Sequence, residues 1–559
     1  MRPRYRALCL WVGLAGAIAF ATPGRAGVPI RQSRYVVSIP DPPCDVEITP
    51  ANAATALGRL NDSAPHVFCV DPGDYRGFYG YVIRTAGTPS SPRYLRYNGP
   101  GAVKAFQRAD QAIFERIDVR ASWWVIQGLT FRPQTAATER IVSLSGVDHV
   151  IVDGNLVDAI EQPNGYFQDA VVIVGNTGVA STDNTIQRNV IRNGDQSHQA
   201  YDFCGVLIAP AFSPNENNDR NHVVDNEISD WGDGVAVAGT LNDCTEPGMQ
   251  HGTVIDNNDI YVTSAKYVDC TTGAADPNGQ CACAENAIDL KADGGPVIAD
   301  WTIVTNNRVW GMRPTTDALV CGGSGALGQA ISAGNECPGH VLAARNVVSD
   351  STIGIEAAGS TWIIAGNLVH DIKASDGNGG AWGTLGILTH DYASNLDIEW
   401  NTIVNAVNSY DDRSTYTSTS CNDVLLTPEA IGYGHPTGLQ TWTTYNYVYQ
   451  SGFFNFPGPT NVFWALAAAS RNSTLCYQRR QWTGEETVCV PYAATTSASP
   501  HRAAAGNCNQ RIAEPFGIPF VGYWQNSPTG TCGLGAELAG VVPLLRRARR
   551  RRDAARGPS

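Results

Sequence analysis

Short apolar stretches alternate with polar steps along the middle of the chain, in a phrase that recurs eight times. Each phrase has apolar residues, a short polar step, and then asparagine, any residue, and valine, isoleucine or leucine. Repeats of roughly 20–50 residues built from short strands are typical of solenoids, in which each unit stacks on the next. The asparagines are Asn155, Asn189, Asn226, Asn258, Asn307, Asn346, Asn367 and Asn401.

A second strand per repeat follows from an alternating pattern between these phrases. A small residue precedes the alternation, as in residues 234–238 and 287–291. Alternation with period two places the second and fourth residues inside and the third and fifth outside. The repeated asparagine falls at the turn after the other strand. There it either stacks into a ladder or satisfies backbone groups where the chain bends.

Together these strands resemble the right-handed parallel β-helix of the pectate-lyase-like superfamily, over roughly residues 116–405. The resemblance implies an all-β fold. It is a single-stranded right-handed parallel β-helix of about 8–10 rungs, with irregular disulfide-pinned loops and a C-terminal cap. Residues 27–115 are then the N-terminal cap and opening rungs, and residues 406–530 an irregular cap with loops. A solenoid presents an extended open face on which a long polymer can lie.

Both ends of the chain indicate export. Residues 1–26 have a basic start, an apolar run too short to span a membrane, and a small residue before the expected cleavage point. Residues 531–559 resemble the C-terminal sorting tags of some Gram-negative bacteria, with Cys-Gly, an apolar stretch and an arginine cluster. The resemblance implies contact with export and sorting machinery and a periplasmic, outer-surface or secreted location. An uncleaved anchor and a plain basic tail are the alternatives.

Cysteine content and net charge limit which ligands and binding partners the protein can have. The chain has 15 cysteines, and in an exported protein clustered cysteines favour disulfides over zinc ligands. Without the four arginines of residues 1–26, the net charge falls from −13 to −17. A protein with this negative charge lacks the basic surface that nucleic-acid binding requires. It would also repel an acidic polysaccharide unless local bases or a bound cation compensate. We expect a monomer with a polysaccharide partner.

One outward-facing charged pair is the main candidate for chemistry. Asp289 and Lys291 occupy the third and fifth positions of one rung, and small residues occupy the same positions on the neighbouring rungs. The two longest excursions, residues 239–284 and 292–329, flank this rung, and insertions in a solenoid often build the walls of its binding face. The plain alternative is a surface ion pair, which contributes little to stability.

The chemistry that fits is β-elimination on a uronic-acid polysaccharide. A base removes the C5 proton, whose acidity rises when the adjacent carboxylate is neutralised by a cation. Lys291 is the candidate base. Oxygen ligands for Ca²⁺, a hard cation, are available from acidic residues on adjacent rungs. These candidate ligands are Asp233, Asp289, Asp202 and Glu285.

The segment 285–291 is similar to the lysine-bearing rung of β-helix polysaccharide lyases. The aspartate of residues 231–234 one rung earlier loosely resembles family-9 pectate lyases, although the aspartate cluster is thinner and the lysine is offset by two residues. Family-6 lyases carry an arginine one rung later, where this chain has Ala330–Gly334. Arg313 is the candidate to replace it from a loop.

Aromatic and acidic residues near this rung complete the candidates. Trp231 and Trp310 are predicted to stack on sugar rings, although packing under loops is the common fate of tryptophan. Glu356 is a further candidate for substrate binding. A glycoside hydrolase using Asp233, Asp289 and Glu356 is one alternative, but no dense carboxylate motif is present. A non-catalytic glycan-binding adhesin is the other, because this fold hosts many functions.

Overall fold

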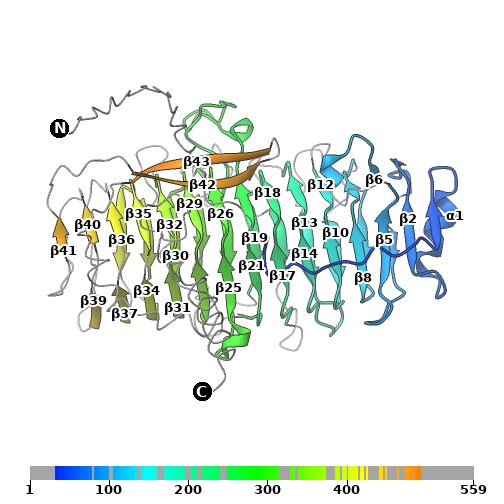
Figure 1. Ribbon diagram of the computed structural model, residues 1–559, viewed down its shortest axis with the longest axis horizontal. Coiled ribbons are helices and arrows are strands. Elements are labelled where there is room, and N and C mark those ends of the chain that lie inside the picture. Colours follow the sequence, from blue (N-terminus) through cyan, green and yellow to red (C-terminus); the bar gives the residue numbers. More distant parts are fainter. Residues whose placement is uncertain are drawn as a thin grey trace, which may run out of the picture.

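The computed structural model describes residues 32–492 apart from gaps, and the predicted signal and sorting segments lie outside the described residues. The longer gaps are residues 160–168, 195–202, 210–216, 240–247, 314–327, 373–383, 426–439, 450–461 and 465–472. The chain winds into a long coil in which each complete rung contributes one strand to each of three parallel sheets (Figure 1). No helix in the described part is long and apolar enough to cross a membrane.

Sheet 1 and sheet 2 each contain 14 strands, joined within each rung by a sharp turn. Sheet 1 consists of β1 (Val46–Ile48), β2 (Val67–Val70), β5 (Arg93–Tyr97), β8 (Trp124–Gln127), β11 (Ile151–Asp153), β14 (Thr185–Gln187), β17 (His222–Val224), β21 (Val254–Asp256), β25 (Thr302–Thr305), β28 (Val341–Ala344), β31 (Ser360–Ala365), β34 (Ser394–Glu399), β37 (Tyr416–Ser420) and β39 (Gln440–Thr444). Sheet 2 consists of β3 (Gly73–Asp74), β6 (Ala112–Phe114), β9 (Thr130–Phe131), β12 (Leu156–Asp158), β15 (Val190–Arg192), β18 (Glu227–Ser229), β22 (Asp259–Tyr261), β26 (Arg308–Trp310), β29 (Val347–Ser349), β32 (Leu368–His370), β35 (Thr402–Val404), β38 (Asp423–Leu425), β40 (Tyr447–Tyr449) and β41 (Val462–Trp464).

Sheet 3 contains 11 strands and carries the candidate site. A short helix, α1 (Ala53–Gly58), lies at the N-terminal end of the stack (Figure 1). Two further strands, β20 (Gly248–Met249) and β24 (Ala292–Asp293), pair outside the three sheets. Sheet 3 consists of β4 (Tyr81–Ile83), β7 (Ile117–Val119), β10 (Arg140–Ser145), β13 (Asp169–Val174), β16 (Cys204–Ile208), β19 (Asp233–Val237), β23 (Asn286–Leu290), β27 (Gln329–Ser332), β30 (Ile353–Ala357), β33 (Leu385–Thr389) and β36 (Asn408–Asp412).

The predicted all-β, right-handed parallel β-helix is confirmed, and its stack is longer than the 116–405 span predicted from the sequence. Parallel pairing begins at Val46 in β1 and still joins β40 to β41 near residue 464. The boundary at residue 405 is therefore not the end of the stack, because β36–β41 continue all three sheets. The sequence repeats Asn-x-Val directly before β38 and β40, at Asn422 and Asn446, but the strands before these asparagines, β37 and β39, lack the aliphatic residues of the eight phrases that defined the predicted span.

The core is the interior of the coil, filled by columns of aliphatic side chains. In sheet 3 the second residue of each alternating phrase forms one such column, and Val206, Val235 and Ile288 are successive members in register. All three are completely buried. Because every rung adds the same side-chain position to the column, each strand buries its inner face against its neighbours and the other two sheets.

The repeated asparagines form a continuous buried ladder at the turn between sheet 1 and sheet 2, as predicted. Each side-chain amide donates to the side-chain oxygen of the next rung's asparagine, at 2.8–3.1 Å. Asn258 shows the full pattern: its Nδ2 also donates to the Val223 carbonyl, and its Oδ1 accepts from the Asn226 backbone N–H. The ladder therefore satisfies backbone groups that the bend removes from the strands.

The residue before a ladder asparagine adopts the left-handed backbone conformation. Asp225, Asn257 and Asn306 have φ values of 58°, 59° and 56°. This conformation costs energy for residues other than glycine, although Asn and Asp tolerate it best. The hydrogen bonds of the ladder offset that cost at each rung, which explains why the asparagine is repeated rather than replaced by another turn residue.

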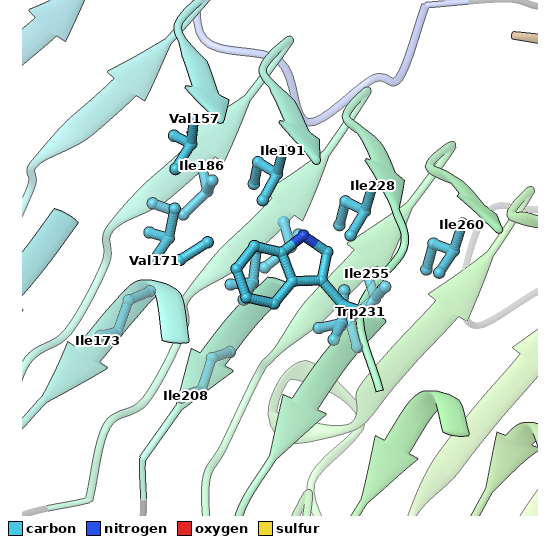
Figure 2. Packing of buried hydrophobic residues seen from close by; sticks show 14 of the residues in the cluster. Val157, Val171, Ile173, Ile186, Ile191, Ile208, Ile228, Trp231, Ile255 and Ile260 are labelled. Carbon is cyan, nitrogen blue, oxygen red and sulfur yellow. The ribbon is translucent and has the colours of Figure 1, made fainter. Parts of the chain in front are cut away.

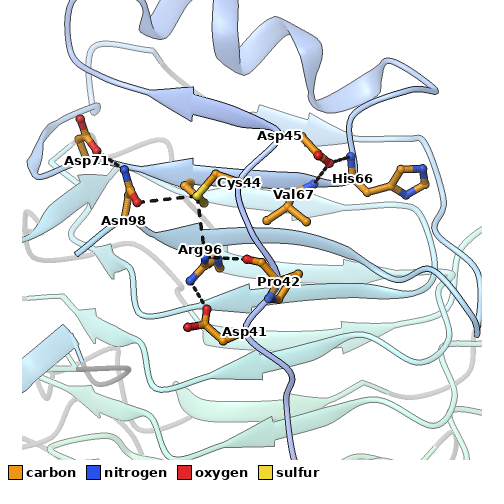
Figure 3. Close-up of a disulfide and its surroundings, with 10 residues drawn as sticks. Asp41, Pro42, Cys44, Asp45, His66, Val67, Asp71, Arg96 and Asn98 are labelled. Atoms are coloured by element: carbon orange, nitrogen blue, oxygen red, sulfur yellow. Dashed lines mark hydrogen bonds and ion pairs between the residues drawn. A yellow bond between two sulfur atoms is a disulfide. The ribbon is translucent and has the colours of Figure 1, made fainter. Parts of the chain in front are cut away.

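The N-terminal segment, residues 32–44, lies across the outside of sheet 1. The Ser33 backbone N–H donates to the Asp225 carboxylate at 3.1 Å, and Val37 exchanges two hydrogen bonds with the Gln187 side chain. At its other end the Cys44–Cys69 disulfide fixes the segment to β2 (Figure 3). Arg96 binds Asp41 beside this disulfide. One extended segment thus connects rungs whose residues lie far apart in the sequence.

A hairpin of β42 (Ser473–Gln481) and β43 (Gly484–Tyr492) lies across sheet 2 (Figure 1). Arg480 binds the Asp259 carboxylate through its backbone N–H at 2.9 Å and through Nε at 2.6 Å. Tyr477 is buried, and its hydroxyl lies 3.1 Å from Nε2 of His370. The hairpin falls within residues 406–530, which were predicted to be irregular because their sequence lacks the periodic pattern of the rungs.

Buried charges lie beneath this hairpin. Burial alone would raise the pKa of Asp259, but the charges of Arg308 and Arg480 hold it below its usual value. Glu227 is the register partner of Asp259 on the previous rung and accepts a hydrogen bond from the Tyr261 hydroxyl. Burial raises the pKa of Glu227 to about 7, and the Asp259 charge adds to that rise.

The ladder predicts a stability cost at one rung. In Asn258→Ala, the Asn226 N–H and the Val223 carbonyl lose buried partners, and unpaired buried groups cost about 1–3 kcal/mol each. We expect the free energy of unfolding by urea to fall by about 3 kcal/mol. Asn278→Ala, at an exposed turn, is the control and is expected to change it by less than about 0.5 kcal/mol. Equal losses in both variants would contradict the role of the ladder.

Glu227 predicts a pH dependence of stability. Its pKa is about 7 in the folded protein against 4.5 for a free glutamate, so the folded state binds the proton more tightly. Its contribution is therefore complete below pH 4.5 and lost as the pH rises through 7, by roughly 3 kcal/mol. Urea unfolding at pH 5 and pH 8 should show this loss in the wild type and not in Glu227→Gln. The exposed Glu47→Gln should behave as the wild type does.

Candidate functional site

Asp289 and Lys291 come together at the end of β23, as the sequence predicts. The Lys291 amine lies 3.0 Å from Oδ2 of Asp289, and the lysine side chain is 32% exposed. The Asp289 side chain is only 2% exposed, so the prediction that both residues face solvent is wrong for the aspartate. The geometry is that of a partly exposed amine held by a buried carboxylate.

The outer face of sheet 3 is buried along most of the third-residue column. Ala236, Asp289 and Ser332 are successive register partners in this column, and none is more than 4% exposed. Alternation with period two separates the faces of a strand correctly, but it carries no information on whether other segments cover the outer face. The Lys291 side chain is 32% exposed, against 22% for the Arg313 side chain and at most 4% for Asp233 and Asp289.

Asp233 lies on the preceding strand, β19, beside this pair. Its Oδ1 accepts a hydrogen bond from the Asn286 backbone N–H at 3.0 Å. Burial raises the pKa of Asp233 well above its usual value, and the charges of Asp289 and Glu285 raise it further. Asp233 therefore holds a proton more tightly than an ordinary aspartate does, beside two other acidic residues.

Cys204 completes this group, and the sequence analysis missed it. It forms no disulfide, it is buried, and its Sγ lies 4.0 Å from Oδ2 of Asp233. Burial, with the charges of Asp169 and Asp233, raises the pKa of the thiol well above its ordinary value, so the inert thiol form dominates. A sequence containing many cysteines gave no signal to separate this one from the disulfide set.

The predicted calcium ligands are only partly covered by the described residues, because Asp202 lies outside them. No group of three or more His, Cys, Asp or Glu side chains converges on one point in the described part of the chain. The Asp289 carboxylate is already paired with the Lys291 amine. Glu285 is partly buried beside this pair.

Arg313 is engaged elsewhere. Its Nε donates to Asp350 at 2.8 Å, its Nη1 donates to the Gly279 carbonyl, and its guanidinium lies 4.0 Å from the centre of the Tyr267 ring. These contacts hold the excursion around residues 267–281, which the Cys270–Cys281 disulfide also closes. The structure therefore gives Arg313 a role in fixing a loop and does not bring it into contact with Lys291.

Both predicted aromatic platforms are buried. Trp231 is 2% exposed and packs inside the coil among Ile208, Ile228 and Ile255 (Figure 2). Trp310 stacks on Tyr261 with ring centres 4.3 Å apart, and the Arg479 guanidinium of the hairpin covers it. Neither indole offers a face to a sugar, because Trp231 fills space in the core and Trp310 is covered by Tyr261 and Arg479.

Glu356 is part of a polar chain rather than an isolated surface residue. Its Oε2 accepts a hydrogen bond from the Ser332 hydroxyl at 2.6 Å, and its Oε1 lies 2.5 Å from Nε2 of His390. Glu356 is buried, and its column includes Ser332 and Asp289 on the two preceding rungs. The sequence placed these residues on one face but gave no sign of their contact.

Comparison with known proteins shows a likeness in fold alone. Neither a family model nor a curated protein sequence matches this chain. The solved PL6 family alginate lyase AlyGC is similar over 81% of this chain, with a TM-score of 0.50 and 12% identity. A mannuronic acid specific family 6 lyase from human gut microbiota covers 69% of the chain and 83% of its own, with a TM-score of 0.47 and 13% identity. This chain spans 57% of the length of AlyGC.

The burial of Trp231 generates a prediction that separates packing from sugar binding. A Cβ atom at Gly194 would lie 2.5 Å from Cδ2 of the indole, so the ring fills a close-packed space. Trp231→Ala should lower the free energy of unfolding by about 3–5 kcal/mol, and Trp231→Phe by less. Urea unfolding measures both. If Trp231→Ala lost glycan binding at unchanged stability, the result would support the predicted stacking of Trp231 on a sugar ring instead.

Proposed function

We propose that this chain is an exported lyase that cleaves a uronate polysaccharide by β-elimination, with Lys291 as the base. The observation that carries the proposal is the partly exposed Lys291 amine, held 3.0 Å from a buried carboxylate on the outer face of sheet 3. The neighbouring rung carries only the small side chain of Ala236 at the position that matches Asp289. The likeness in fold to an alginate lyase supports the choice of substrate class.

The reaction follows from these positions. Lys291, after giving its own proton to solvent, takes the proton from C5 of a uronate residue, and the electrons of that C–H bond form the C4–C5 double bond. The bond from C4 to the glycosidic oxygen breaks, and this oxygen leaves as a hydroxyl after taking a proton from solvent. Asp289 orients the amine and stabilises the ammonium group that forms. No step in this scheme uses a metal ion.

A second candidate, a glycan-binding protein without catalysis, is favoured by a specific observation. Asp233, Asp289 and Glu356 are each at most 4% exposed, whereas catalytic carboxylates must reach a substrate. A hydrolase is less well supported, because Asp289 is paired with Lys291 and Glu356 with His390. The two main candidates differ in whether an unsaturated product is released.

Lys291→Ala tests the proposal directly. The wild-type protein should release unsaturated products, seen as ultraviolet absorbance, from at least one of alginate, pectate and chondroitin. Loss of the base should lower kcat by about 10²–10⁴-fold. Lys266→Ala is the matched control, because this lysine donates to the Gly194 carbonyl and takes no part in the Asp289–Lys291 pair. Full activity in Lys291→Ala, or no product from any of the three polysaccharides, would contradict the proposed lyase activity.

The same assay tests the calcium dependence predicted from the sequence. Asp202, one of the predicted calcium ligands, lies outside the described residues, so the calcium site stays a prediction: the rate of product release should fall after chelation. Loss of activity in chelator, restored by Ca²⁺, would indicate that Asp202 completes a site with Glu285 and its neighbours.

A further inference from the structure

A row of side chains follows the turns that join sheet 3 to sheet 1. Trp123, His149, Asp183 and Arg220 occupy one aligned position just before β8, β11, β14 and β17, because these strands pair in register. The rings of Trp123 and His149 stack with their centres 4.0 Å apart. Arg220 donates to both carboxylate oxygens of Asp183 at 2.8 Å. Neighbouring rungs thus hold these planar side chains in place.

This row is open to solvent, unlike the outer face of sheet 3. The side chains of His149, Arg220 and Asp183 are 42%, 51% and 28% exposed. Nδ1 of His149 lies 2.8 Å from the Asp148 carboxylate, and Nε and Nη2 of Arg220 bind Asp183. Within the described residues, Nε2 of His149 and Nη1 of Arg220 therefore remain for a ligand.

Exposed apolar side chains gather in the same turns. Of the four large hydrophobic residues that are exposed in the described part of the chain, three lie between a sheet 3 strand and the next sheet 1 strand or in the excursion there. Val179 is 54% exposed and lies between β13 and β14, whereas Val297 and Ile298, 59% and 45% exposed, lie between β24 and β25. Apolar groups are therefore available to a ligand beside the polar row.

The loop of residues 294–300 borders the row. Gly252 is the next aligned position after Arg220. A Cβ atom at Gly252 would lie 3.0 Å from Cγ of Arg220 and 3.3 Å from the Ala299 carbonyl oxygen. Val297 and Ile298 thus belong to a segment that adjoins the exposed guanidinium side chain.

The turn itself does not require these large side chains. Trp123, His149 and Arg220 have φ values of 63°, 57° and 54°, in the left-handed region that bulky residues rarely adopt. Gly252 fills the aligned position with a φ of 68°, at no steric cost. The fold therefore accounts for the turn and leaves the choice of Trp, His and Arg unexplained. Strained backbone of this kind is often kept where the side chain serves a function.

We propose that the turn strip, defined as Trp123, His149, Asp183, Arg220, Val179, Val297 and Ile298, binds polysaccharide outside the Lys291 site. The class of ligand rests on the proposed function. The Arg220–Asp183 pair offers donors and acceptors with matched charge, which suits sugar hydroxyl groups. The apolar side chains suit the C–H faces of pyranose rings. Rungs lie about 4.8 Å apart, so a polymer along the stack meets a new side chain at each rung.

The binding test uses the full chain carrying Lys291→Ala, so that the polymer stays intact. Dissociation constants for alginate, pectate and chondroitin are measured by electrophoresis in gels that contain each polymer. Adding His149→Asn and Arg220→Asn together should weaken binding of the recognised polymer about tenfold. Asparagine tolerates the left-handed backbone, so the urea midpoint of unfolding should stay unchanged or rise.

Arg188→Asn is the matched control. Arg188 has a φ of 55° and a bidentate pair with Asp153, but it lies at the turn between sheets 1 and 2. Its replacement should leave polymer binding unchanged. In the protein with Lys291 intact, the double variant should raise KM for the polymer about tenfold and leave kcat unchanged, because the strip takes no part in the chemistry.

The outcomes separate the strip from the lyase. Unchanged affinity in the double variant, or an equal loss in Arg188→Asn, overturns the strip even if turnover is normal. Weaker binding in the double variant, with no turnover by the wild type, supports the strip and overturns the lyase. Binding to phosphatidylcholine vesicles and to none of the polymers overturns the strip as a sugar site. If the double variant fails to fold, Val297→Ser with Ile298→Ser is held to the same loss of affinity.

Discussion

The asparagine ladder at the turn between sheets 1 and 2 is the constraint on which the rest of the stack depends. A sharp turn inside a solenoid buries backbone N–H and C=O groups that have no strand partner, and each would be costly if left unpaired. The ladder pairs them rung by rung, and each asparagine needs the next one in register. A slip of one residue would break the ladder and turn every inward side chain outward.

Because the ladder fixes the register, residues distant in the sequence align in straight columns across sheet 3. Asp289 and Ser332 are 43 positions apart in the sequence numbering and are register partners on adjacent strands. The Asp289–Lys291 pair and the Ser332–Glu356–His390 chain thus follow one another along a single face. A polymer has a periodic structure of its own, and an exposed periodic surface such as the turn strip can meet it with a different group at each repeat.

The sequence predicted the fold and the Asp289–Lys291 contact because both depend on local periodicity. The ladder repeats a visible motif, and two residues with one residue between them on a strand share a face. The burial of Trp231 and Trp310 was not predictable, since neighbouring turns and a distant hairpin decide it. The same holds for Arg313, whose partners Asp350 and Gly279 come from other rungs. Aperiodic contacts of this kind leave no pattern in a single sequence.

The N-terminal segment and the C-terminal hairpin reach the same turn from opposite ends of the chain. Ser33 binds the Asp225 carboxylate, while Nη1 of Arg480 binds the Asp225 carbonyl at 3.1 Å. A solenoid with contacts between adjacent rungs alone can fray from either end, one rung at a time. Here the two outer segments both contact the same residue, Asp225. Detaching either outer segment must therefore break a contact at a central rung. The rungs are thus expected to unfold together rather than one at a time from the ends.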